Sequence, residues 1–406
     1  MDPQCQTAVG GLFPPQAPTG LQDGQSGFTK VRLFDNTNKK VFAETTTMIS
    51  EYRSASRFQE TQKQAGGFYQ VAVNGKIDLT LIAWHNCNGN NQKCGWINDM
   101  DGMEEFIYVK IDQPDQISYR YSTGGARISR GGWWNWNWNE NKWKLPTKGK
   151  YLLFYTCRTY QGSGGFGKMR LNHNRQGAQH RSERMITEIQ GSRGYSFTNH
   201  VASGVYLFDN QYDNSVMYTQ YYATNSGIGW QSDSNGHNHF VAVKVEDGSV
   251  GEKQQSPEGG DTGRKNYRVG AFAKLTGYHW DLPGAGTYIL YCTLRTYHGN
   301  YGKAVVKLDV NSASGDAKLL APDKDGSKYG STVRMQEYWK AKPFSFTNHI
   351  ATWSWRVTVT GRMQIGLYGK SDRGSIGLQN DGNGWSSCIW WKPPSSETGP
   401  TLVLPE

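Results

Sequence analysis

Long apolar segments are missing from this chain of 406 residues. No stretch approaches the roughly 18 consecutive apolar residues that cross a bilayer, so we expect no transmembrane segment. Residues 1–26 show neither the positively charged start nor the apolar stretch of a secretory signal. Asn-x-Ser/Thr glycosylation sites are also absent, although asparagine is abundant. These absences favour a virion or the cytoplasm over the classical secretory route.

Catalytic motifs are missing too, since the sequence has no Gly-x-Ser-x-Gly elbow and no His-Glu-x-x-His pair. The run from Gly162 to Lys168 resembles a phosphate-binding loop. However, Met169 replaces the Ser/Thr that should follow the lysine, and a strand-like segment follows where a helix is needed. No carboxylate pair can be told apart from ordinary turn residues. We therefore expect a protein without enzymatic activity.

Cysteine is sparse, and its six positions do not form the two paired halves of a zinc site. Cys87 and Cys94 flank a polar loop, and this pair could either form a disulfide or bind a metal ion. We interpret most of the cysteines as reduced core residues. The six are Cys5, Cys87, Cys94, Cys157, Cys292 and Cys388.

Aromatic residues and glycine are plentiful, with 15 Trp, 23 Tyr and 49 Gly. This composition favours short, half-buried strands joined by tight turns over helices or disorder. The net charge of +10 favours anionic partners, with solubility alone as the alternative. Because the first lysine is Lys30, no basic arm precedes the fold, and specific contact with nucleic acid is not expected.

One segment occurs three times without a gap, at residues 95–110, 229–244 and 377–392. Each copy has a glycine, an aspartate that opens an Asp-x-Asx-Gly turn, and a β-rich run that ends in lysine. The second and third copies share further motifs, such as Ser196–Val201 and Ser345–Ile350. Repeats of this kind indicate a tandem array of one structural unit, which presents repeated surfaces.

The repeats predict an all-β chain of tandem antiparallel jelly-roll sandwiches, two complete and one truncated. In the first copy, Leu12–Pro18 stands where a counterpart of Gly149–Tyr155 is expected. Its prolines cannot donate to a central ladder, so we expect the opening strands to be missing. The predicted organisation is an irregular arm (1–26), a truncated module (27–113), a second module (114–248), a flexible linker (249–264), a third module (265–393) and a tail (394–406).

Short motifs resemble the jelly-roll heads of the tumour necrosis factor and complement families. They are the Pro-x-x-Gly-x-Tyr start at Pro146–Tyr151 and the hairpins Val71–Leu79 and Val357–Leu367. The start of each module departs from that family's pattern. The resemblance implies trimerisation, within one chain or between chains. The tail contains the β-formers Thr401–Leu404, and we expect them either to complete the first module by strand addition or to form a frayed end.

The Asp-x-Asx-Gly turns are candidates for Ca²⁺, because oxygen side chains two positions apart can bind this ion. The same turns are also the commonest hairpin turns. Only the first copy offers a further acidic ligand, so its calcium candidates are Asp99, Asp101 and Glu104. No other cofactor is expected.

A tryptophan–asparagine run lies at residues 132–139. Alternation along a strand places Trp134, Trp136 and Trp138 on one face and the asparagines on the other. This pattern suits sugar stacking, a protein–protein interface or simple core filling. The candidate residues are Trp133, Trp134, Trp136, Trp138, Asn135 and Asn137.

A basic segment in the second module is a candidate for binding phosphate or sulfate, with a solvated surface or an inter-subunit surface as the alternatives. It lacks the interleaved aromatics that stack nucleic-acid bases. Its members are Lys168, Arg170, Arg175, Arg181 and Arg184. His237 and His239 share a strand face, but no third metal ligand is near them.

Two classes of function follow. The first is a structural assembly protein built of repeated modules, such as a capsid, cement or spike protein of a virion, with other protein subunits as partners. The second is a lectin-like or complement-like protein that binds a glycan or another ligand with the help of calcium.

Overall fold

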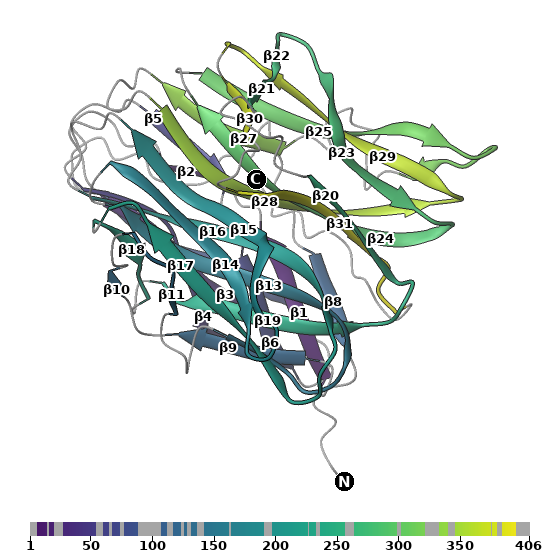
Figure 1. Ribbon diagram of the computed structural model, residues 1–406, viewed down its shortest axis with the longest axis horizontal. Coiled ribbons are helices and arrows are strands. Elements are labelled where there is room, and N and C mark those ends of the chain that lie inside the picture. The colour runs from purple at the N-terminus through teal and green to yellow at the C-terminus, as the bar shows by residue number, and fades with distance from the viewer. Residues whose placement is uncertain are drawn as a thin grey trace.

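The computed structural model describes residues 6–13, 16–19, 27–53, 60–64, 67–73, 77–87, 107–111, 117–122, 126–127, 131–135, 142–161, 164–190, 197–225, 227–232, 236–255, 264–298, 302–320, 333–339, 346–374, 376–379 and 384–394. Every regular element in these ranges is a β-strand, and nearly all strand pairs are antiparallel (Figure 1). The predicted all-β class is therefore confirmed. None of the described segments is a helix that spans a membrane.

The second module is a two-layer sandwich. Its inner sheet runs β9 (Ile117–Ser122), β19 (Asn238–Val245), β13 (Gly149–Gln161), β16 (Phe197–Asn210). Its outer sheet runs β12 (Lys142–Leu145), β17 (Ser215–Ala223), β14 (Gly165–His173), β15 (Gly177–Gln190). In chain order these are strands 1-8-3-6 and 2-7-4-5, which is the jelly-roll arrangement. The short strands β10 (Ala126–Arg127), β11 (Trp134–Asn135) and β18 (Ile228–Trp230) extend its edges.

The third module repeats this order. Its inner sheet runs β20 (Val250–Gln255), β31 (Ser386–Trp391), β24 (Gly286–His298), β28 (Phe346–Val359). Its outer sheet runs β23 (Ala273–Leu282), β29 (Met363–Ser371), β25 (Gly302–Ala313), β27 (Val333–Trp339). Four short strands are added, namely β21 (Arg264–Asn266), β22 (Arg268–Val269), β26 (Leu319–Leu320) and β30 (Ile376–Gln379). Residues 250–255, expected to belong to a flexible linker, are thus a strand of this module.

The first module contains an opening strand that we expected to be missing. β1 (Gln6–Phe13) pairs with β6 (Gly67–Val73) and β8 (Ile107–Ile111), as β13 pairs with β16 and β19. β2 (Gln16–Thr19) pairs with β5 (Glu60–Gln64) further along the same path. β1 and β2 together therefore correspond to the single strand β13 of the second module. The break between them falls at Pro14 and Pro15. The prolines divide the opening strand and do not remove it.

The outer sheet of the first module is shorter than those of the other two. It is made of β7 (Leu79–Cys87), β3 (Gly27–Asp35) and β4 (Lys40–Arg53). No described residue of the first module supplies a counterpart of β9 or β12, so strands 1 and 2 of the jelly-roll order are lacking in the described part.

Strand pairing joins the three modules into a closed ring. β4 of the first module pairs with β16 of the second, and β15 of the second pairs with β28 of the third. β27 of the third module then pairs with β5 of the first, and Figure 1 shows these two strands side by side. The registers agree at all three junctions, where Glu51 faces Asn199, Glu188 faces Asn348 and Glu337 faces Gln62. One chain thus has the arrangement of a trimer.

Two of the strands nearest the centre of the ring, β19 and β31, are largely buried on both faces, so each contains a continuous apolar run. On β19, Phe240 and Ala242 belong to the core of the second module, whereas Val241 and Val243 belong to a core shared by all three modules. The equivalent positions in the shared core are Ile107 and Val109 on β8 and Ile389 and Trp391 on β31. The repeated β-rich run therefore serves both the sandwich and the ring.

Candidate functional site

A cluster of cations and aromatic rings lies on the outer sheet of the second module. Along β14, Met169 and Leu171 point into the core, so the alternate residues Phe166, Lys168 and Arg170 lie on the opposite face. β17 contributes Gln220 and Tyr222, which lie opposite Arg170 and Lys168 in the register. Trp133 joins them from the segment before β11. We call Trp133, Phe166, Lys168, Arg170 and Tyr222 the cation–aromatic face.

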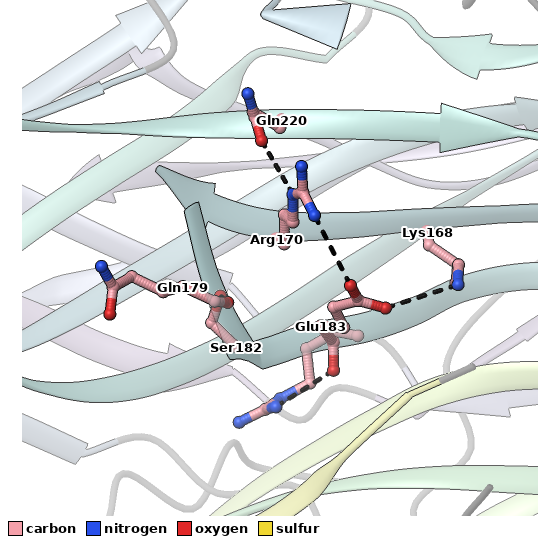
Figure 2. Close-up of polar contacts among 7 residues, drawn as sticks. Lys168, Arg170, Gln179, Ser182, Glu183 and Gln220 are labelled. Carbon is pink, nitrogen blue, oxygen red and sulfur yellow. Dashed lines mark hydrogen bonds and ion pairs between the residues drawn. The ribbon is translucent and has the colours of Figure 1, made fainter. Parts of the chain in front are cut away.

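The negative charge of Glu183 on β15 partly offsets the positive charges of Lys168 and Arg170 (Figure 2). Its carboxylate lies 3.4 Å from Nζ of Lys168 and 3.8 Å from Nη1 of Arg170. Nε of Arg170 also donates to Oε1 of Gln220 at 2.8 Å. The side chains of Lys168 and Arg170 are only 12% and 13% exposed. Burial lowers the pKa of Arg170, and the charge of Glu183 opposes that effect.

Aromatic rings cover the same cations. The guanidinium carbon of Arg170 lies 4.1 Å from the ring centroid of Trp133, and Nζ of Lys168 lies 5.4 Å from that of Tyr222. Contacts of this kind contribute about 0.5–2 kcal/mol each. Trp133 is held in place by the preceding turn, where Gly131 adopts a φ of +81° and donates its N–H to Ala223. The face is therefore a pre-organised, largely dehydrated surface.

The other two modules carry similar contacts at equivalent positions. In the first module, Nζ of Lys30 lies 4.8 Å from the ring centroid of Trp84, its partner across β3 and β7. In the third, Nζ of Lys307 lies 5.2 Å from the ring centroid of Phe272, which also contacts Lys370. The Gly270 turn before Phe272 matches the Gly131 turn before Trp133, with its N–H bonded to Ser371. The face is thus repeated around the ring.

The tryptophan–asparagine run is only partly described. Trp133 is half-buried against Tyr222, whereas Trp134 is 50% exposed and pairs with Tyr221. Asn135 belongs to β11, and Trp136, Trp138 and Asn137 lie outside the described residues. The predicted ligand or interface role therefore rests on Trp133 and Trp134 in this structure.

The basic segment does not form one surface. Arg175 stacks on Tyr212 at the tip of the β14–β15 hairpin, and Arg181 is exposed on β15. Arg184 is fully buried, lies over the ring of Tyr206 and donates to Oγ of Ser387 in the third module at 3.3 Å. Arg184 thus joins the second and third modules, a role that the sequence did not reveal.

The calcium candidates Asp99, Asp101 and Glu104 lie outside the described residues, as do most residues of the equivalent turns. No cluster of metal-ligating side chains occurs among the residues that the structure does describe. The residue after each described turn meets the preceding module. The N–H of His237 donates to Thr46 O at 2.9 Å, and that of Trp385 donates to Glu183 O at 2.8 Å.

The glycine that ends the repeated turn has a packing role. A Cβ at Gly384 would lie 2.6 Å from the backbone nitrogen of Met185 on β15. This close approach is only open to glycine. In the third copy, the glycine of the Asp-x-Asx-Gly turn is therefore required by a contact between modules, in addition to the turn itself.

The side chains of three of the six cysteines are described, and all three are buried thiols, namely Cys157, Cys292 and Cys388. Burial raises the pKa of Cys157 and Cys292 well above the usual value. Cys292 and Cys388 face each other across β24 and β31 with their Sγ atoms 3.1 Å apart. The question of a Cys87–Cys94 disulfide falls outside the described side chains.

Comparison with known proteins identifies no family. No family model matches the chain, and no curated protein matches it. Among solved structures, a recombinant N-glycanase F is 9% identical, covers 71% of this chain and 100% of its own, and has a TM-score of 0.27. The infectious bursal disease virus Gx strain is 6% identical, with coverages of 99% and 77% and a TM-score of 0.18. The VP2 subviral particle of that virus is 8% identical, with coverages of 99% and 79% and a TM-score of 0.14. At these TM-scores, none of the three supports an inference about the function of this chain.

Proposed function

We propose that this chain is a non-enzymatic structural protein that assembles with other protein subunits, as a capsid, cement or spike protein of a virion does. The observation that supports this proposal is the closed ring of three modules. Ring closure by strand pairing produces a rigid block with three similar outer faces. Blocks with rotational symmetry are the usual units of closed assemblies, because each copy of a surface can make the same contact.

Exposed aromatic side chains on the outer faces are the contacts that we expect to drive assembly. Trp84 is 48% exposed on the first module and Trp134 is 50% exposed on the second. Tryptophan is enriched among the residues that dominate protein–protein interfaces. Trp84 lies beside Lys30, and Trp134 directly follows Trp133, whose ring contacts Arg170, so apolar contact and charge lie close together on both modules.

Mass measurement on the purified full chain over a range of concentrations tests this proposal. We expect discrete oligomers or particles that grow with concentration, and a weaker tendency to assemble in the double variant Trp84→Ser/Trp134→Ser. Leu320→Ser is the matched control, because Leu320 is also 50% exposed but lies on β26, outside the cation–aromatic faces. A chain that stays monomeric at every concentration would contradict the proposal.

A second candidate function is ligand recognition by a lectin-like protein. The observation that favours it is the pairing of exposed tryptophan with nearby cations and amides, because sugar rings stack on aromatic faces and acidic sugars add charge attraction. A glycan array, run with and without a chelator, tests it. Binding that is lost in Trp134→Ser would support this function, and loss with chelator would implicate the calcium loops. Absence of glycan binding by the native chain, both with and without the chelator, would exclude this second function.

A further inference from the structure

One inner strand of the ring has an open edge in the described part of the chain. The outer edge of β19 is covered by β9, and that of β31 is covered by β20. β8, the equivalent strand of the first module, pairs with β1 on one side and has no described strand on the other. This edge belongs to the strand whose Ile107, Val109 and Ile111 form part of the shared core.

The path of the chain shows how the other two edges become covered. After β8 the chain crosses from the first module to the second and forms β9 on β19. After β19 it crosses from the second module to the third and forms β20 on β31. The crossings take only residues 112–116 and 246–249. In each case, the segment after the last strand of one module supplies the first strand of the next module in the ring.

The same step after β31 leads from the third module back to the first. Residues 392–400 follow β31, and this segment is longer than residues 112–116 or residues 246–249. Next comes Thr401-Leu402-Val403-Leu404, an apolar β-forming segment of about the length of β8. The sequence therefore offers a β-forming segment at the point where the pattern of the other two modules predicts a strand.

We propose that residues 401–404 add to the open edge of β8 as an antiparallel strand of the same chain. The added strand is the first module's counterpart of β9 and β20. It is also a second connection between the third module and the first, besides the pairing of β27 with β5. The inference is independent of the proposed function, since it concerns how the block itself is completed.

The described strands also set the register of the added strand. Val250 of β20 faces Trp391 of β31, and both lie in the shared core. Val109 is the counterpart of Trp391, and Leu402 is the first leucine after β31, so the shortest connection places Leu402 opposite Val109 and Leu404 opposite Ile107. Two leucines then enter the shared core beside two apolar partners, because directly opposed residues share a face. On the other face, Val403 covers Tyr108, whose side chain is 37% exposed.

Paired cysteines test the register in the full chain. Lys110→Cys/Thr401→Cys should form an intrachain disulfide in the monomer under mild oxidation. The matched positive control is Lys392→Cys/Ser249→Cys at the equivalent place in the third module, where Lys392 N donates to Ser249 O at 2.7 Å. The single variants control for the native cysteines. A bond between two chains, or no bond while the control pair forms one, would overturn the proposal.

Hydrogen exchange supplies an independent test. Removal of residues 401–406 should accelerate exchange of the amides of residues 107–111 by about tenfold or more, because that edge loses its cover. Residues 386–391, which β20 covers, should keep their exchange rates. Removal of residues 405–406 alone should change neither segment. Unchanged exchange at residues 107–111 in the longer deletion would overturn the proposal even if the protein assembles as proposed above.

Discussion

Single residues at the junctions between modules have roles that depend on the whole ring. Gly384 is one, because its missing side chain lets the third module approach the backbone of β15. Arg184 is another, because its guanidinium crosses to Ser387. Neither residue touches the cation–aromatic faces, so changes at these positions test the ring without altering the proposed contact surfaces.

Gly384→Ala should destabilise the protein by about 1–3 kcal/mol, because the new methyl group must push against the backbone of Met185. Urea unfolding measures the change. Gly374→Ala is the control, since a Cβ at Gly374 meets nothing within 4 Å, and its stability should stay within experimental error. Equal stability of the two variants would mean that the close approach at Gly384 does not exist in solution.

His239 makes the junction between the first and second modules sensitive to acid. Its ring is buried against the edge of Tyr69, and burial, together with the nearby His237, lowers its pKa to about 3. The unfolded chain takes up this proton near pH 6.5, whereas the folded chain does not until about pH 3. The neutral state therefore stabilises the fold fully above pH 6.5, and this contribution is lost as the pH falls toward 3.

At pH 5 the loss from His239 should be on the order of 2 kcal/mol relative to pH 7.5. Urea midpoints of the native protein and of His239→Gln, measured between pH 5 and pH 7.5, give the effect by difference. The difference removes the contribution of carboxylates that titrate in both proteins. Parallel pH profiles would show that His239 titrates normally.

At the scale of elements, one buried tryptophan ties the two sheets of each complete module together. Trp143 on β12 donates its indole N–H to Phe154 O on β13 at 3.0 Å, and Trp280 on β23 makes the same bond to Tyr291 O on β24 at 3.1 Å. Both side chains are fully buried. The bond links strand 2 of one sheet to strand 3 of the other.

Trp143→Phe should cost about 1–3 kcal/mol, because the carbonyl of Phe154 loses its partner and the smaller ring leaves space in the core. Chemical denaturation measures the loss. Trp134→Phe provides the comparison, since the exposed Trp134 should tolerate the same change. If the two variants were equally stable, the indole bond of Trp143 would not contribute to folding.

Strand positions followed from the sequence wherever alternation and turn residues agreed, as in β13, β24 and the three copies of the closing strand. β1 was missed because Pro14 and Pro15 disguise a strand that ends just before them. β20 was read as linker because its polar residues, such as Glu252 and Gln254, show no apolar run. Pairing between modules has no local signal, since an edge strand looks the same whether its partner belongs to its own module or to the next.

The candidate surface was predictable only in part. Lys168, Arg170 and Trp133 were named from the sequence, but as members of two separate features. Their contact depends on the register between β14 and β17 and on the Gly131 turn, which only the assembled sheet reveals. Tyr222 and Glu183 carried no motif. Cross-strand alignment of the repeats is the signal that points to Tyr222, because Lys30 and Trp84 occupy the same pair of positions as Lys168 and Tyr222.

At the scale of the whole molecule, the ring predicts that the two fragments stay associated after a single cleavage between the second and third modules. A protease site placed within residues 256–263 should be cleavable without separation of the two fragments. β20 stays paired with β31, β15 with β28 and β27 with β5 across the cut. Native gel filtration followed by denaturing electrophoresis should show both fragments in one peak. Two separate peaks would mean that the pairings do not hold the modules together.

Ring closure within one polypeptide also removes a constraint that identical subunits share. In a homotrimer, one substitution appears at three places at once, so every face must tolerate it. Here a change at Trp84 leaves Tyr222 and Lys370 as they are, and each side of the block is free to acquire its own binding partner. Three-sided geometry is thereby compatible with three distinct neighbours.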